Sequence, residues 1–217
     1  MEPFEIPLEW KRWKSYDHGY KSPAGCVWFT QDYDGIIYIY RERYWSSKPN
    51  KGSESPIEDI ARDINDAEDV ERKLKIKFRS NVADSAIFMR DGRHKSVADV
   101  FADYGVVWES SAKGPGSRVQ GLQEIVDRLA NNSLKVFSTC KHWLRTVPSL
   151  PADTKKIEDI DTKAEDHLFD ATRYGLMLRR ARSIKPKPKD KGPKPFTMEW
   201  LDKIDELYER DDPWPII

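Results

Sequence analysis

The sequence contains few cysteines and no long apolar segment. Only Cys26 and Cys140 occur among its 217 residues, and two distant cysteines make neither a disulfide framework nor a cysteine zinc site. The longest apolar run, residues 35–40, is far shorter than the roughly 20 residues that a membrane-spanning helix needs. The residues after Met1 lack a basic stretch leading into an apolar one. We therefore expect a protein of a reducing cytoplasm, neither exported nor bound to a membrane.

The chain also lacks net charge, because 37 Lys and Arg balance 37 Asp and Glu. The charge is nevertheless unevenly distributed, since residues 179–195 read RRARSIKPKPKDKGPKP. Prolines at this spacing exclude a helix or a central strand. Beyond them, Thr197 is a good N-cap residue and Leu201 begins an apolar helical stripe. We expect one domain over residues 1–180, then a basic proline-rich linker and a C-terminal tail helix over 181–217.

Hydrophobic periodicity predicts an α/β fold for the first domain. The expected strands are residues 10–16, 26–30, 36–45, 77–83 and 106–109, and the expected helices start near Ser55, Val97, Ser117 and Thr162. Capping boxes are expected at three of these helix starts, formed by the pairs Ser55 and Glu58, Ser117 and Gln120, and Thr162 and Glu165. Strands alternating with helices in this order suit a mixed central sheet flanked by helices.

Four aspartates stand at positions where the pattern favours chemistry. Asp17 ends the first strand, and Asp84 ends the strand over 77–83. Asp166 and Asp170 lie four residues apart, so a helix projects them from nearly the same face. Their structural alternatives are turn formation and, for Asp166, a favourable place in a first helical turn. Asp170 should lie one turn deeper and repel Asp166 unless a cation lies between them.

Carboxylates from two strand ends and one helix are the ligands that two-metal phosphodiester hydrolysis requires. Hard cations such as Mg²⁺ and Mn²⁺ prefer oxygen ligands, and the sequence has no His and Cys cluster that would favour zinc. The four aspartates therefore predict a site for two divalent cations.

Residues 165–174, EDHLFDATRY, closely resemble the DH-x-x-DA-x-RY signature in the nuclease domain of large terminase subunits, the DNA-packaging motors of tailed bacteriophages. Residues 16–19, YDHG, and 82–86, VADSA, resemble the other two motifs of that domain in the same order. Residues 114–121, GPGSRVQG, resemble the stretch before its penultimate helix. The resemblance covers residues 10–180 and implies an RNase H-like fold whose first strand lies in the middle of the sheet. It also implies a metal-dependent endonuclease that cuts concatemeric double-stranded viral DNA.

The resemblance implies roles for the acidic residues. Asp17 corresponds to the carboxylate that bridges both metal ions, and Asp84 to the acid at the end of the adjacent strand. The final helix supplies the third ligand, for which both Asp166 and Asp170 are candidates. Glu42 on the third strand is a possible further acid, with an exposed strand charge as its alternative.

Two basic residues are candidates for contact with DNA. Lys113 and Arg118 flank a Gly-Pro-Gly loop before a helix, where backbone amides and the helix dipole favour phosphate. Their alternative is the role of ordinary solvated loop charges.

The sequence lacks the G-x-x-x-x-G-K-[ST] motif of an ATPase, so this chain is expected to be a C-terminal nuclease fragment with an added or fortuitous Met1. In the full-length protein the resemblance implies portal protein, small terminase subunit and procapsid as partners, and the cytoplasm of the infected bacterial host as the location. Two alternatives remain open. One is a stand-alone RNase H-like nuclease or resolvase, and the other is a non-catalytic module that docks on a portal or capsid protein.

Overall fold

The computed structural model describes residues 1–90, 92, 94–112, 114–154, 156, 158–178, 197–198 and 201–202. The chain divides into two compact units, Met1–Ile184 and Lys185–Ile217. In the second unit, the amide of Leu201 donates to the carbonyl of Thr197 at 3.0 Å, as in a helical turn. The rest of the expected linker and tail helix lies outside the described residues. No helix among those described is long and apolar enough to cross a membrane.

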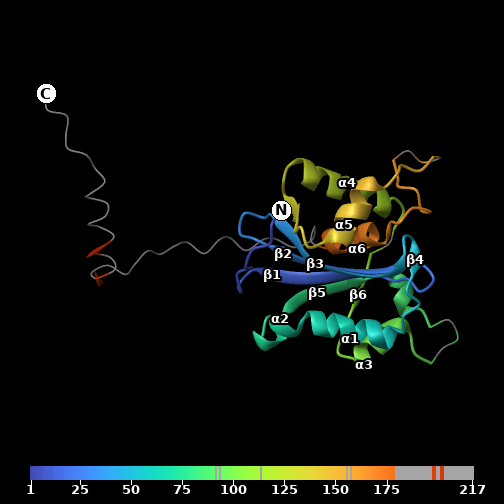
Figure 1. Ribbon diagram of the computed structural model, residues 1–217, viewed down its shortest axis with the longest axis horizontal. Helices are drawn as coiled ribbons and strands as arrows, with labels where there is room; N and C mark the ends of the chain where they lie inside the picture. The colour runs from blue at the N-terminus through green and yellow to red at the C-terminus, as the bar shows by residue number, and fades with distance from the viewer. Residues whose placement is uncertain are drawn as a thin grey trace. The chain divides into compact units, whose positions relative to one another are not determined.

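The first unit is built on a seven-stranded mixed sheet (Figure 1). Its strands are β1 Lys11–Asp17, β2 Ala24–Gln31, β3 Ile37–Lys48, β4 Lys51–Gly52, β5 Phe78–Ala83, β6 Glu109–Ser110 and β7 Leu134–Val136. The strand order is β4-β3-β2-β1-β5-β6, and β7 pairs with β3. Strand β2 is antiparallel to both β1 and β3, and β4 is antiparallel to β3. The pairs β1 and β5, β5 and β6, and β3 and β7 are parallel. The sequence correctly predicted a mixed sheet with its first strand inside.

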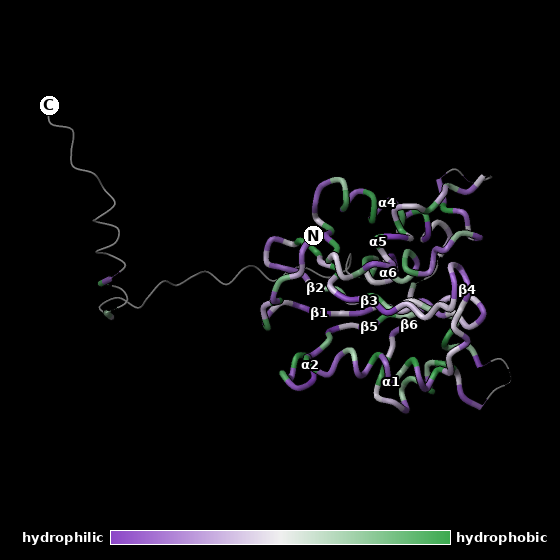
Figure 2. Tube along the Cα trace, viewed as in Figure 1, coloured by the Kyte–Doolittle hydropathy of each residue, from purple (hydrophilic) through white to green (hydrophobic). Residues whose placement is uncertain are grey.

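Helices cover both faces of the sheet, as expected (Figure 1). Helices α1 Ile57–Ala67, α2 Asp69–Lys73 and α3 Val97–Asp103 lie on one side, and α4 Ser117–Ala130, α5 Lys141–Thr146 and α6 His167–Met177 lie on the other. Short 3₁₀ turns span Ser85–Phe88 and Val147–Ser149. Apolar and polar segments alternate along α1 in Figure 2, because Ile60, Ala61 and Ile64 face the core while its other side faces solvent.

Hydrogen bonds between β1 and α6 fix the helix on the sheet. The indole of Trp13 donates to the carbonyl of Gly175 at 3.0 Å, and the hydroxyl of Ser15 donates to the carbonyl of Ala171 at 2.5 Å. Asp17 contacts His167 at 3.2 Å. Two residues along a strand advance about 6.6 Å and four along a helix about 6 Å, so successive inward side chains of β1 meet successive turns of α6. Asp17 is thereby held beside the first turn of α6.

The opposite face of β1 carries buried positive charge. Lys14 pairs with Glu68 at 2.6 Å, and Arg12 pairs with Glu71 at 3.3 Å. All four residues are buried, and buried charges persist in folded proteins when they are paired in this way. These pairs tie β1 to the segment around α2, away from α6.

The helix starts differ from the sequence expectations. Helix α1 begins after Pro56, and α4 begins after Gly116, whose φ is 77°; neither N-cap residue makes a side-chain hydrogen bond. A capping box does form at α3, between Ser96 and Asp99. The last helix begins at His167 and not near Thr162.

Tertiary contacts explain why the last helix starts late. The predicted capping residue Glu165 accepts hydrogen bonds from both terminal guanidinium nitrogens of Arg145 at 2.8 Å and from the hydroxyl of Tyr44 at 2.8 Å. The side chain of Asn50 also donates to the carbonyl of Lys163 at 2.9 Å. These partners, distant in sequence, hold the segment before α6 out of a helix.

Candidate active site

Two of the predicted acids lie side by side at the ends of parallel strands. Tyr16 of β1 pairs with Ala83 of β5, so the next residues, Asp17 and Asp84, leave the sheet at the same edge. The amide of Asp84 donates to the carbonyl of Tyr16 at 3.0 Å. One carboxylate oxygen of Asp84 accepts from the amide of Ala86 at 2.9 Å, which shapes the 3₁₀ turn after β5.

The carboxylate of Asp17 is buried with only 5% of the residue exposed. Burial above all, together with the nearby charges of Asp170 and Asp84, raises its pKa to about 7 against the opposing hydrogen bond with His167. Burial by itself disfavours the charged imidazole of His167, but the hydrogen bond and charge of Asp17 raise the pKa of that histidine overall. Both groups of the pair therefore hold a proton more readily than they would in water.

The remaining two predicted acids lie at the start of α6. Asp166 is the N-cap residue and Asp170 lies in the first turn, with the Asp170 amide donating to the Asp166 carbonyl at 2.8 Å. Asp170 thus lies one turn beyond Asp166, as expected, and the correction concerns Asp166, which is the N-cap residue and not a residue of the first turn. The correction follows from the late start of the helix, and it places both carboxylates where the helix dipole favours negative charge.

Arg118 lies close to both of these acids. Its guanidinium contacts Asp166 at 2.5 Å, Asp159 at 3.0 Å and Asp170 at 3.4 Å. Asp170 also accepts from Nε of Arg173 at 2.6 Å. Burial raises the pKa of Asp166 despite the opposing bond from Arg118. The guanidinium is thus engaged by three carboxylates, and the expected contact of Arg118 with DNA stays a prediction. Lys113 lies outside the described residues.

The pKa of Tyr174 responds to one acid of α6 together with Asp17 and Asp84. The residue is buried, and its pKa is raised well above the ordinary value, first by burial and then by the charges of Asp17, Asp170 and Asp84. The charge of Asp170 also raises the pKa of Asp17, and the charge of Asp166 acts on His167. Asp17, Asp84 and Asp170 therefore form one electrostatic group, which we call the carboxylate group.

Glu42 does not belong to this group. Its two carboxylate oxygens accept from the amides of His142 at 2.7 Å and Trp143 at 2.8 Å, at the start of α5. Burial raises the pKa of Glu42, and these two amides oppose the shift. Free amides at a helix start need such acceptors, so the carboxylate of Glu42 caps the start of α5.

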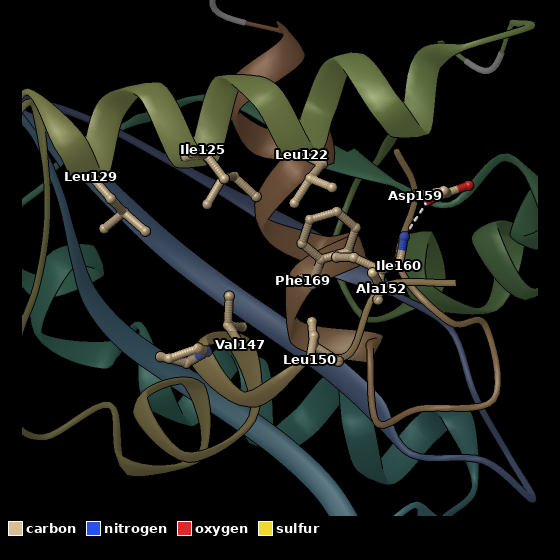
Figure 3. A pocket seen from close by; sticks show the side chains of 11 residues that line it. Leu122, Ile125, Leu129, Val147, Leu150, Ala152, Asp159, Ile160 and Phe169 are labelled. Carbon is tan, nitrogen blue, oxygen red and sulfur yellow. Dashed lines mark hydrogen bonds between the residues drawn. The ribbon is translucent and has the colours of Figure 1, made fainter. Parts of the chain in front are cut away.

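An apolar hollow lies next to Arg118 and its partners. It measures about 290 Å³, and Figure 3 shows its lining side chains from α4, from the segment after α5 and from Phe169 of α6. Asp159 is the charged residue of its lining. One oxygen of Asp159 accepts from the amide of Ile160 at 2.8 Å and from Arg118, so its carboxylate is fixed at the rim. Sequence reasoning did not identify Asp159, which belongs to no motif.

The carboxylates have the oxygen atoms that divalent cations prefer as ligands, but these atoms are bonded to other side chains of the protein. Over the part of the chain that the structure describes, no three His, Cys, Asp or Glu side chains converge closely enough to hold a metal ion. Asp17 is bonded to His167, and Asp170 is bonded to two arginines. Their oxygen donors nevertheless match the preference of hard cations, and the nearby negative charges of Asp170 and Asp84 raise the pKa of Asp17 in addition to its burial.

Comparisons with known proteins agree with the sequence resemblance, although no family model matches the chain. The chain is 26% identical over 201 residues to the terminase large subunit of Salmonella phage P22, covering 88% of this chain and 36% of that protein. It is 24% identical over 186 residues to the terminase large subunit of Enterobacteria phage LP7, covering 82% and 35%. The chain thus spans about a third of the length of these curated relatives.

Solved structures show the same fold. The nuclease domain of the P22 large terminase superposes with a TM-score of 0.61 at 21% identity, covering 85% of this chain and 89% of that domain. The large terminase nuclease of thermophilic phage G20c, solved with bound cobalt, gives a TM-score of 0.51 at 9% identity, covering 79% and 82%. The chain is therefore related in sequence to the large terminase subunits of bacteriophages, and its first unit has the RNase H-like fold of their nuclease domains.

Proposed function

We propose that this chain is a metal-dependent endonuclease that cuts double-stranded viral DNA during genome packaging. The observation that carries the proposal is the carboxylate group, in which Asp17 and Asp84 end neighbouring parallel strands at one edge of the sheet and the charge of Asp170 on α6 acts on Asp17. The relatives named terminase large subunit support a packaging role over a stand-alone resolvase. Cleavage of concatemers, and partners such as a portal protein, small terminase subunit and procapsid in the host cytoplasm, belong to the proposal for the longer protein.

We propose two Mg²⁺ or Mn²⁺ ions as the cofactors. The G20c nuclease has been solved with cobalt and with zinc, which supports divalent cations at this fold. Bound at the carboxylate group, such cations would lower the pKa of an attacking water and stabilise the leaving oxygen. The identity and number of the ions stay part of the proposal.

The residues of the chain supply a fixed set of oxygen donors. Strand pairing on both sides of β1 and the hydrogen bond from Ser15 to α6 fix the backbone that carries Asp17. The charges of Asp84 and Asp170 both act on Asp17, which suits a carboxylate that bridges two metal ions. His167 contacts Oδ2 of Asp17 through Nδ1 and orients that carboxylate.

Asp170 is the better candidate of the two helix acids. Its charge is among the causes that raise the pKa of Asp17 and of Tyr174. Asp166 makes the shortest contact with Arg118, at 2.5 Å. We therefore assign Asp170 to the carboxylate group and Asp166 to the adjoining pair with Arg118.

The proposal is tested by incubating supercoiled plasmid with the full chain in Mn²⁺, in Mg²⁺ and in EDTA. We expect nicking and linearisation with either metal and none in EDTA. The variants Asp17→Asn, Asp84→Asn and Asp170→Asn should each lose cleavage while keeping a cooperative melt. Asp66→Asn, an exposed site on α1 across the sheet, is the matched control and should cut like the parent.

Intact plasmid at high protein concentration in Mn²⁺ would reject the enzyme and favour the non-catalytic docking module. Selective cleavage of four-way junctions over linear duplex would instead favour the resolvase alternative.

A further inference from the structure

One arginine fills the space between three acidic side chains at the edge of the candidate site. Arg118 on α4 contacts Asp159 in the segment before α6, Asp166 at the N-cap of α6 and Asp170 in the first turn of α6. Only 20% of its side chain is exposed. A helix N-terminus repels a cation, so the guanidinium is held there by the carboxylates and by the ring of Phe169, whose centroid lies 5.7 Å from the guanidinium carbon.

Close packing of α4 on α6 brings the arginine to this position. Gly121 lies one helical turn after Arg118, and a Cβ atom at Gly121 would approach Cβ of Arg173 to 2.8 Å. The glycine therefore lets the two helices approach at the level of the acids. The close packing of α4 on α6 therefore brings Arg118 next to these acids.

We propose that Arg118 is an internal counter-ion that neutralises Asp166 and Asp170 in the metal-free protein and competes with divalent cations for Asp170. The inference rests on the proposed function, because Asp170 belongs to the carboxylate group. Oxygen atoms that accept hydrogen bonds from a guanidinium are not free to coordinate a cation in the same geometry. A guanidinium within a few ångströms also repels an incoming divalent cation. Arg118 is thus a positioning residue that sets how readily the site takes up metal.

The test is the Mn²⁺ affinity of Arg118→Gln, measured on the full chain by titration calorimetry without DNA. Removing a like charge at a half-buried site should tighten Mn²⁺ binding by at least about tenfold. In EDTA the variant should melt lower than the parent, because Asp166 and Asp170 then repel each other without a cation. Adding Mn²⁺ should raise its melting temperature more than that of the parent.

Arg128→Gln is the matched control, since Arg128 lies on the same helix and pairs with Glu124 away from the carboxylate group. Its Mn²⁺ affinity should equal that of the parent. Arg118→Lys provides a second variant if Arg118→Gln does not fold. A lysine lacks the planar fork that contacts three carboxylates, so Arg118→Lys should bind Mn²⁺ more tightly than the parent by a smaller factor.

The two proposals fail in different ways. Unchanged or weaker Mn²⁺ binding by the Arg118 variants, with normal binding by the parent, overturns the counter-ion role alone. Absence of Mn²⁺ binding in the parent and in every Arg118 variant overturns both the counter-ion role and the metal-dependent nuclease.

Discussion

At the end of β1, burial raises the pKa of Asp17 to about 7, and the charges of Asp170 and Asp84 act in the same direction. An unfolded aspartate has its ordinary pKa near 3.8. The folded state therefore retains a proton that the unfolded state releases, and folding becomes less favourable as the pH rises between these two values. The contribution of Asp17 to stability is fully present below about pH 4 and is lost as the pH passes about 7.

This linkage predicts the pH dependence of Asp17→Asn in EDTA. Asparagine carries no titrating proton, so the variant should gain stability relative to the parent as the pH rises from about 4 to about 7.5. The relative gain should be on the order of 2–4 kcal/mol, because one unit of pKa shift corresponds to about 1.4 kcal/mol. Urea unfolding at a series of pH values measures it. If the stability difference between variant and parent does not change with pH, the pKa of Asp17 is not raised in the folded protein.

The sequence identified the acids of the site but not the residues that neutralise them. Asp17, Asp84, Asp166 and Asp170 stand at strand ends and in a local motif, which a single sequence reveals. The partners of Arg118 lie 41, 48 and 52 residues away from it, and no spacing rule connects such positions. Only the packing of α4 on α6 brings them together.

At the scale of elements, the packing of α6 against β1 and β2 requires a residue without a side chain. Gly175 faces the sheet, and a Cβ atom there would approach the ring of Phe29 to 2.5 Å and the hydroxyl of Ser15 to 3.0 Å. The carbonyl of Gly175 also accepts from Trp13. The glycine therefore sets how closely the helix that carries Asp170 approaches the strand that carries Asp17.

Gly175→Ala should destabilise the protein by roughly 1–3 kcal/mol, the usual cost of inserting a methyl group into a packed core. Helix propensity alone would favour alanine by about 1 kcal/mol, so the sign of the change distinguishes close packing from local preference. Cleavage by this variant should also fall, because the added methyl group moves α6, which carries Asp170, away from β1. Gly114→Ala is the control, since a Cβ there meets nothing within 4 Å. Equal or higher stability of Gly175→Ala in urea unfolding would contradict this account.

The length of an element decided whether the sequence could predict it. Strands β1, β2 and β3 and helix α4 each span at least seven residues, long enough for a periodic pattern to appear. Strand β7 has three residues and α5 has six, and neither was predicted. Both depend on partners far away in the chain, with β7 pairing to β3 and α5 starting on the carboxylate of Glu42.

At the scale of the whole molecule, everything proposed for catalysis belongs to the first unit. The buried core, the β1–α6 hydrogen bonds and all four predicted aspartates lie within residues 1–184. The chain spans about a third of its curated relatives and lacks an ATPase motif. The proposed hydrolysis of DNA therefore rests on residues of the first unit.

Deleting residues 185–217 tests whether the first unit is sufficient. We expect the fragment to melt within a few degrees of the full chain and to cut plasmid in Mn²⁺ at a rate within about twofold, because every core residue among those that the structure describes is retained. Its affinity for DNA should become less dependent on salt, since the deletion removes the lysines of residues 185–194, and each phosphate contact contributes to the salt dependence. Calorimetric melting and filter binding at several salt concentrations measure both effects. A fragment that is insoluble or melts far below the parent would show that the second unit completes the fold of the first, and would move the domain boundary beyond Ile184.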